Sequence, residues 1–356
     1  MAESQEKVQQ YMETSVLHAV VAAYGLGAVH TPPIRQGGAI NHVLLVSTDL
    51  GNAIVRVHRP ETVAERLMAV HQVQERLRRE GLPIPSIWRT RDNSSWISVD
   101  DRLVEVISFV PDGHEVGTWD DAAVLFSQLG RFHAAIREID PVHLSPPVHA
   151  CYVTPETGLI LLKTTEHAFR TERGNPAYTL AAEARRSTEL LLRRLQVARQ
   201  IYEESLPQTL IHGDFVGNNV LIDGRKVVAI LDFDRLAVRH RVYEVAYVLM
   251  YVLSRLVRTG VRTPTSDHSL TDDDIAHIAH LLVRYRDESS WDPTSAEMLA
   301  LPFEMARAPL YPVVAAGLIP QHAMTETLNF ANHLPLAHWL VDHATMASRS
   351  LHERMG

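Results

Sequence analysis

The sequence predicts an α+β protein with an antiparallel sheet in its N-terminal third and a mainly helical remainder. Two observations lead to this prediction. Short runs of strand-forming residues, separated by turn signals, lie between residues 43 and 107. From Trp119 onward apolar residues recur at helical spacing, and prolines interrupt the pattern at intervals. We therefore divide the chain into regions 1–108 and 109–356.

The composition narrows the class of protein. The chain has 356 residues, of which 46% are hydrophobic and 21% are charged, and its net charge is −8. This balance argues against a nucleic-acid partner, which would usually be met by a basic face. The single cysteine, Cys151, fits a reducing compartment. The N-terminus has no signal-peptide pattern and no apolar run would span a bilayer, so we expect a cytoplasmic protein without a membrane partner. The oligomeric state stays open.

The first elements are a helix over residues 5–25 and a β-hairpin. The hairpin follows Gly37-Gly38 and uses residues 43–47 and 53–57 as its strands. Glycines at such a position let the backbone approach phosphate groups and offer N–H donors to them.

A helix follows the hairpin. Thr62-Val63-Ala64-Glu65 reads as a capping box that starts it, and Gly81 ends it. Residues 84–88, 95–99 and 103–107 then read as strands that complete a five-stranded antiparallel sheet.

The second region is expected to contain helices over residues 122–139, 183–204 and 244–259, and a short strand over 209–211. Further helices follow Gly260. Among them, Pro302 is taken as a helix start, which places Glu304 in a first turn.

The segment from His212 to Asp234 is the most informative part of the chain. It contains an H-x-D-x-x-x-x-N pattern, then two β-branched runs joined by a polar turn, and then Asp-Phe-Asp. When the hairpin folds, Asn219 is expected almost opposite Asp232, with Asp214 beside them. This arrangement suits a hard divalent cation bridging phosphates, with one carboxylate left to orient a hydroxyl.

This segment resembles the catalytic loop and metal-binding hairpin of the aminoglycoside phosphotransferase/choline kinase/type II homoserine kinase superfamily. These are small-molecule kinases with a protein-kinase-like, two-lobed fold, so region 1–108 would be the N-lobe and region 109–356 the C-lobe. The resemblance implies that Asp214 is the catalytic base and that Asn219 and Asp232 hold Mg²⁺.

The resemblance also implies a binding site for ATP or GTP. A Gly-Gly-x-x-Asn pattern would hold the phosphates, a strand arginine would contact them, and the backbone of the connector between the lobes would bind the purine. The corresponding residues here are Gly37, Gly38, Asn41, Arg56, Ser108 and Val110.

Two departures from the family pattern leave questions. Many relatives carry a glutamate near position 70 that pairs with the strand Lys or Arg, whereas this chain has Val70 followed by His71. What orients Arg56 is therefore open. The usual Gly-Asp turn after the hairpin is absent, although its later acid is retained as Glu244. The Asp-Phe-Asp resembles the branch around type II homoserine kinases and makes Asp234 a second candidate acid.

Three functional hypotheses follow. In the first, the chain transfers the γ-phosphoryl group of ATP or GTP to a hydroxyl of an antibiotic and so inactivates it. In the second, the acceptor is homoserine or a similar amino-alcohol. In the third, the chain is a catalytically inactive kinase-like binding protein. The acceptor site is expected between the hairpin and the helices after Gly260, with Asp234 and Glu304 among its walls.

Overall fold

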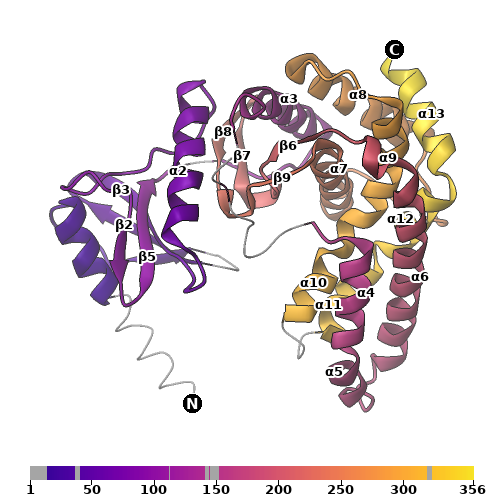
Figure 1. The fold of residues 1–356 in the computed structure, drawn as a ribbon, viewed down its shortest axis with the longest axis horizontal. Coiled ribbons are helices and arrows are strands. Elements are labelled where there is room, and N and C mark those ends of the chain that lie inside the picture. The colour runs from indigo at the N-terminus through magenta and orange to yellow at the C-terminus, as the bar shows by residue number, and fades with distance from the viewer. Residues whose placement is uncertain (1–13, 37–40, 112, 141–143, 145–151, 319–322) are drawn as a thin grey trace. The chain divides into compact units, whose positions relative to one another are not determined.

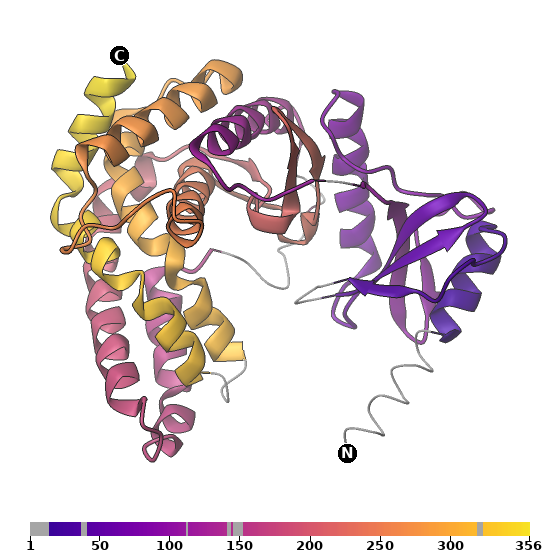
Figure 2. The same cartoon turned by 180° about the vertical axis from the view of Figure 1, so that it is seen from behind.

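The computed structural model describes residues 14–36, 41–111, 113–140, 144, 152–318 and 323–356. The chain divides into two compact units, which Figures 1 and 2 show from opposite sides. The first, here the sheet unit, comprises Met1–Gly113, Asp140–Val148 and Val228–Asp234. The second, here the helical unit, comprises His114–Ile139, His149–Val227 and Arg235–Gly356. The fold thus combines an antiparallel sheet with a largely helical region, as the sequence predicts.

A five-stranded antiparallel sheet forms the core of the sheet unit, in the order β1-β2-β3-β5-β4. Its strands are β1 (Ile34–Gln36), β2 (His42–Thr48), β3 (Gly51–Val57), β4 (Ile97–Val99) and β5 (Arg102–Ser108). The predicted hairpin is confirmed, because β2 and β3 pair from His42 opposite Val57 to Thr48 opposite Gly51.

One face of this sheet is apolar and packs against the helical segment 14–24. Successive side chains of a strand point to opposite faces, so alternate positions of β3 share this face. The buried cluster consists of Val16, Val20, Tyr24, Leu26, Leu44, Val46, Ala53, Val55, Val57, Val104 and Val106. The intervening residues of β3 and β5 therefore project to the opposite face. They include the charged pair Arg56 and Glu105.

Helix α2 (Ala64–Arg79) follows the hairpin as expected, and Gly81 after it has a φ of +85°. The predicted capping box is wrong. Thr62 donates its backbone N–H to the carbonyl of Arg59 in a turn, and Val63 is the N-cap without a side-chain cap bond. The Thr62 N–H, which the Glu65 side chain would accept in a capping box, is thus bonded to Arg59 instead.

The prediction of a strand over residues 84–88 is also wrong. This segment makes one isolated bridge, between Ile87 and Ile107, and β1 supplies the fifth strand instead. Pro83 and Pro85 flank its start, and a proline has no N–H for a strand ladder.

Helices make up most of the helical unit. They are α3 (Trp119–Ile136), α4 (Pro155–Thr164), α5 (Glu166–Thr171), α6 (Tyr178–Tyr202), α7 (Arg241–Arg258), α8 (Asp272–Ser289), α9 (Ser295–Arg307), α10 (Tyr311–Leu318), α11 (Ala323–Ala331), α12 (Leu334–Asp342) and α13 (Ala344–Met355). Helices α4, α5, α6, α10 and α11 gather at one end of the unit (Figures 1 and 2). Helices α3 and α7 pack beside its short strands, and α8 and α9 pack against α3 and α7, respectively. Within the described residues, no helix is both long and apolar enough to cross a membrane.

One short antiparallel ladder flanks the motif segment, and another lies within it. In one, β6 (Gln208–Ile211) pairs with β9 (Ala237–His240). In the other, β7 (Val220–Asp223) pairs with β8 (Lys226–Ile230), which confirms the predicted hairpin and its turn at Gly224. The end of β8 belongs to the sheet unit, where the Ile230 N–H donates to the carbonyl of Pro83 at 2.8 Å.

Pro302 does not start a helix. Helix α9 begins seven residues earlier at Ser295, where Thr294 and Glu297 form a capping box, and Pro302 lies in its interior. The local signal of the proline was therefore outweighed by a stronger N-cap upstream. Glu304 consequently lies near the C-terminal end of α9 rather than in its first turn.

Candidate active site

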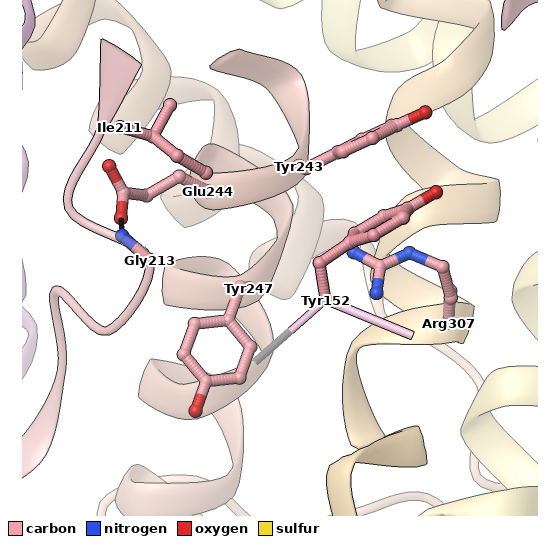
Figure 3. Close-up of a pocket in the computed structure, with 7 residues that line it drawn as sticks. All are labelled: Tyr152, Ile211, Gly213, Tyr243, Glu244, Tyr247 and Arg307. Carbon is pink, nitrogen blue, oxygen red and sulfur yellow. Dashed lines mark hydrogen bonds between the residues drawn. The ribbon is translucent and has the colours of Figure 1, made fainter. Parts of the chain in front are cut away.

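The catalytic-loop motif begins where β6 ends, and a buried carboxylate fixes its backbone. Glu244 on α7 accepts the N–H of His212 at 3.1 Å. It accepts the N–H of Gly213 as well, at 2.6 Å (Figure 3). It also accepts a hydrogen bond from Nε2 of His133 at 2.8 Å. The side chain of Glu244 is fully enclosed, so three donors satisfy a charge that would otherwise be costly to bury.

Gly213 is required at its position for two reasons. Its φ is +82°, a conformation that residues with a Cβ rarely adopt. A Cβ added there would also lie 2.4 Å from the carbonyl oxygen of Arg235. The imidazole of His212 packs edge-on against Phe132 and Phe215, and its Nδ1 accepts the N–H of Asp214 at 3.2 Å. The His-Gly pair therefore supports the loop, and Asp214 is the residue that it presents.

The Asp214 carboxylate is held by three side chains. Its Oδ2 accepts from Nδ2 of Asn219 at 2.9 Å and lies 3.0 Å from Nη1 of Arg235. Its Oδ1 accepts from the hydroxyl of Tyr247 at 3.2 Å. The side chain is 14% exposed, so it is fixed in orientation but still reachable. A general base needs this combination.

Arg235 and Tyr247 were missed by the sequence reasoning. Arg235 also donates to the hydroxyl of Tyr311 at 2.7 Å, which fixes its guanidinium from a second side. A signal for Tyr247 existed, because it lies three residues after Glu244 and so on the same face of α7. No comparable signal pointed to Arg235.

Asn219 is buried, and its side-chain nitrogen donates to the carbonyl oxygen of Asp214 at 3.1 Å as well as to its carboxylate. Its Oδ1 is then the atom left to act as a ligand. An amide oxygen and a carboxylate are the donors that hard divalent cations prefer, so Asn219 and Asp232 have the chemistry expected of an Mg²⁺ pair. Asn219 lies in the helical unit and Asp232 in the sheet unit, and their joint role stays a prediction. Throughout the described residues, no three His, Cys, Asp or Glu side chains form a metal-binding group.

Arg56 is the centre of a charged cluster in the sheet unit. Its Nη2 lies 2.6 Å from Oδ1 of Asp232 and 2.8 Å from Oδ2 of Asp234. Burial opposes the charge of Arg56, but Asp234, Asp232 and Glu105 outweigh it and raise the pKa of the guanidinium. Asp232 has a φ of +59°, which an aspartate tolerates better than most residues.

Asp234 is tied from several sides. Nδ2 of Asn41 donates to its Oδ2 at 2.6 Å, and Nη2 of Arg66 donates to its backbone carbonyl at 2.7 Å. Asn41 and Asp234 were predicted to bind the nucleotide and the acceptor, respectively. In the structure they bind each other, and Asp234 also contacts Arg56, which connects the phosphate side of the predicted site to the Asp-Phe-Asp segment.

The remaining predicted residues have varied surroundings. Gly37 and Gly38 lie outside the described residues. Ser108 ends β5 and donates its N–H to the carbonyl of Ser86 at 2.9 Å, so that donor is engaged within the sheet unit. Val110 follows in the connector with intermediate exposure.

Glu304 was predicted to face the acceptor, but its side chain is only 1% exposed. It accepts a hydrogen bond from Tyr202 at 2.9 Å and pairs with Arg307 at 2.5 Å, both within the helical unit. The requirement of that prediction, a carboxylate facing a cleft, is not met. Because α9 begins upstream of Pro302, Glu304 lies near its C-terminal end, where Tyr202 and Arg307 bind the carboxylate.

Behind the catalytic loop lies a small cavity of about 20 Å³, which is room for about one water. Figure 3 shows its lining, which consists of Tyr152, Ile211, Gly213, Tyr243, Glu244, Tyr247 and Arg307. The Tyr152 and Tyr243 rings stack with centroids 4.3 Å apart, and the Arg307 guanidinium lies 4.0 Å from the Tyr152 centroid. This packed wall supports the loop from behind and leaves no space for an acceptor.

A larger cavity of about 730 Å³ lies in the helical unit, between the C-terminal half of α7 and the junction of α11 with α12. Its volume is in the range of small-molecule sites. Among the described residues, the lining carries Arg258, Arg262, His268 and His333 but no acidic residue. Burial and the nearby Arg258 lower the pKa of His333.

Comparison with known proteins identifies the family. A family model described as "Phosphotransferase enzyme family" matches residues 32–276. The chain belongs to this family. The match spans the five-stranded sheet, the catalytic loop, the hairpin and α7, whereas the helical segment 14–24 and α9 to α13 lie beyond it.

Among curated proteins, the homoserine kinase of Zymomonas mobilis is 23% identical over 202 residues. The alignment covers 55% of this chain and 57% of that relative, so the chain spans a little over half the length of the relative.

Solved structures share the fold at lower identity. An amicoumacin kinase, in complex with AMP-PNP, Ca²⁺ and its ligand "Ami", matches with a TM-score of 0.64 at 16% identity, covering 93% of this chain and 95% of that one. A microcompartment-associated aminopropanol kinase gives 0.65 at 16% identity, covering 96% and 98%. A spectinomycin phosphotransferase, in complex with ADP and spectinomycin, gives 0.62 at 13% identity, covering 95% and 98%. These neighbours confirm a protein-kinase-like fold, and they include kinases of antibiotics and of metabolites.

Proposed function

We propose that this phosphotransferase is an Mg²⁺-dependent kinase that transfers the γ-phosphoryl group of ATP or GTP to a hydroxyl of a small molecule. The observation that carries the proposal is the Asp214 carboxylate, held by Asn219, Arg235 and Tyr247 at the end of a loop that Glu244 fixes. A carboxylate that is fixed in orientation yet reachable favours a general base over an inactive binding protein.

Asp214 would orient the acceptor hydroxyl and accept its proton as the oxygen bonds to phosphorus. Phosphoryl transfer depends mainly on positioning and on neutralising charge, so the fixed direction of this carboxylate is its main contribution. Tyr247 and Arg235 keep it from rotating toward other donors. The leaving group is the nucleoside diphosphate.

Arg56 would contact the phosphates, with Gly37, Gly38 and Asn41 beside it, while Ser108 and Val110 would lie along the purine. Arginine suits this role because its planar fork of N–H donors matches phosphate oxygens. Asn219 and Asp232 would hold Mg²⁺, which when bound neutralises phosphate charge. Asp234 would keep Arg56 and Asn41 in place, since it bonds both.

For the acceptor we propose an antibiotic, because kinases of amicoumacin and spectinomycin share the fold over nearly the whole chain. The second candidate is an amino-alcohol such as homoserine, and the homoserine kinase relative favours it. The acid-free lining of the larger cavity would suit an uncharged or anionic acceptor better than a polycation.

A panel assay tests the proposal. Consumption of ATP and of GTP is measured with Mg²⁺ against a set of antibiotics and a set of amino-alcohols, using wild type and Asp214→Asn. We expect one acceptor class to stimulate consumption in the wild type alone. If the folded wild type binds neither nucleotide with Mg²⁺, the kinase proposal fails and the inactive binding protein stands.

A further inference from the structure

The sheet unit contains a buried group that the proposed chemistry does not use. Glu105 lies on β5 directly opposite Arg56 on β3, and in an antiparallel pair such residues project to the same face. The Glu105 side chain is 4% exposed, and its Oε1 lies 3.4 Å from Nη1 of Arg56. A buried carboxylate in the middle of a strand needs partners, and its partners suggest its role.

Both oxygens of Glu105 are engaged. Nε2 of His58, just after β3, lies 2.9 Å from Oε1, and Nε2 of His71, on α2, lies 2.6 Å from Oε2. Nδ1 of His71 lies 2.8 Å from the hydroxyl of Ser95. We assign the ring proton of both histidines to Nε2, since a carboxylate accepts there and the Ser95 hydroxyl can donate to Nδ1 of His71.

These contacts make Glu105 a fixed negative charge. Burial alone would raise its pKa, but His58 and His71 outweigh burial and hold the pKa of Glu105 well below its ordinary range. With donors on both oxygens, the carboxylate cannot turn away from Arg56 without losing a hydrogen bond.

The three acids around Arg56 differ in exposure. Asp232 and Asp234 have side chains that are 36% and 25% exposed, and both contact Nη2. Glu105 is buried and lies at Nη1, on the other nitrogen. Phosphates that engage Nη2 would therefore leave the Glu105 contact in place. His71 of α2 reaches the same carboxylate from the helix.

We propose that Glu105, clamped by His58 and His71, is the positioning residue that orients Arg56 toward the nucleotide phosphates. This inference rests on the proposed nucleotide role of Arg56. It predicts that Glu105 affects nucleotide binding only through Arg56, which separates it from a residue that merely stabilises the sheet unit.

A double-mutant cycle tests the coupling. The dissociation constant of Mg²⁺–ATP is measured by calorimetry for wild type, Glu105→Gln, Arg56→Met and the double variant. Replacing one partner of a charge-assisted hydrogen bond should weaken binding about 10-fold or more in the wild-type background. In the Arg56→Met background, Glu105→Gln should have no further effect. Additive effects in the cycle would overturn the proposal.

Two further variants supply controls. Glu297→Gln removes another buried carboxylate, which pairs with Arg241 in the helical unit, and it should lower the melting temperature without changing nucleotide affinity. If Glu105→Gln does not fold, His71→Leu and His71→Gln replace it. Leucine removes the donor to Oε2 of Glu105 and should weaken nucleotide binding. Glutamine retains a donor, so the His71→Gln protein should bind the nucleotide more tightly than the His71→Leu protein.

The outcomes separate this inference from the proposed function. If wild type does not bind Mg²⁺–ATP or Mg²⁺–GTP, the proposed function fails. If wild type binds and the folded Glu105→Gln or His71→Leu protein binds equally well, only the positioning role fails.

Discussion

The clearest mutational prediction concerns Glu244, which links the core of the helical unit to the catalytic loop. Its Oε1 accepts from Gly213, and its Oε2 accepts from both His212 and His133. In Glu244→Gln, the amide oxygen can replace only one of the two carboxylate oxygens. The less costly orientation keeps the oxygen at Oε2 and points the amide N–H₂ group at the Gly213 N–H.

The variant therefore loses one charge-assisted hydrogen bond and gains two donors that face each other. A bond of this kind contributes about 1.5–3 kcal/mol, and we expect the free energy of unfolding to fall by about that amount. Gly213 would move away from the amide, and Asp214 follows it directly in the chain. The turnover number should fall more than nucleotide affinity, because Gly213 and Asp214 themselves have no proposed contact with the nucleotide.

The assay combines denaturant unfolding with steady-state kinetics and nucleotide calorimetry. Glu297→Gln is the matched control, since it also removes a buried carboxylate from the helical unit, but one that pairs with Arg241 and Trp291 rather than with the loop. It should lose stability and keep the turnover number. Equal losses of turnover in both variants, or none in Glu244→Gln, would refute the role assigned to Glu244.

Three further predictions follow from the geometry. Gly213→Ala should nearly abolish turnover and lower the melting temperature, because its Cβ would lie 2.4 Å from the Arg235 carbonyl; Gly224→Ala, with open space around its Cβ, is the control. Ser254 on α7 also lines the larger cavity and is partly exposed, so Ser254→Trp should fill part of it and raise the acceptor KM with the nucleotide KM unchanged; an unchanged acceptor KM would place the acceptor elsewhere. The folded pKa of Glu105 is lowered, so its contribution to stability should be complete above about pH 4.3 and be lost as the pH falls through the folded value. The free energies of unfolding of wild type and Glu105→Gln, measured from neutral to acidic pH, test this prediction. A difference between the two that grows as the pH falls would contradict it.

Much of the fold could be predicted because its signals are local. The β2–β3 and β7–β8 hairpins are each defined by two apolar runs and a turn within a short segment, and the structure has both. The helices after Trp119 follow from periodicity in the same way. The failures occurred where one local signal competed with another. At Thr62 the backbone N–H bonds to Arg59 in a turn, and the helix does not use the predicted cap. Pro302 lies in the interior of α9, which starts at an N-cap upstream.

The contacts that hold the site residues in place could not be predicted from local signals, because they join residues far apart in the sequence. Arg56 and Glu105 are brought together by the β3–β5 register, which the sequence alone does not give. One signal was present: Glu105 is a charge between Leu103 and Ile107, on a strand that is otherwise apolar at alternate positions. Likewise, nothing local predicts that Arg235 pairs with Asp214.

The measurement that tests the central claim most directly is the turnover of Asp214→Asn beside its affinity for Mg²⁺–nucleotide. The assay uses the acceptor identified by the panel, and Asp223→Asn, an exposed carboxylate at the end of β7, is the control. A general base contributes about 10²–10⁴ to the rate, so Asp214→Asn should lose turnover by that factor while nucleotide affinity and the control stay as in the wild type. Near-normal turnover of Asp214→Asn would contradict the assignment of Asp214 as the catalytic base.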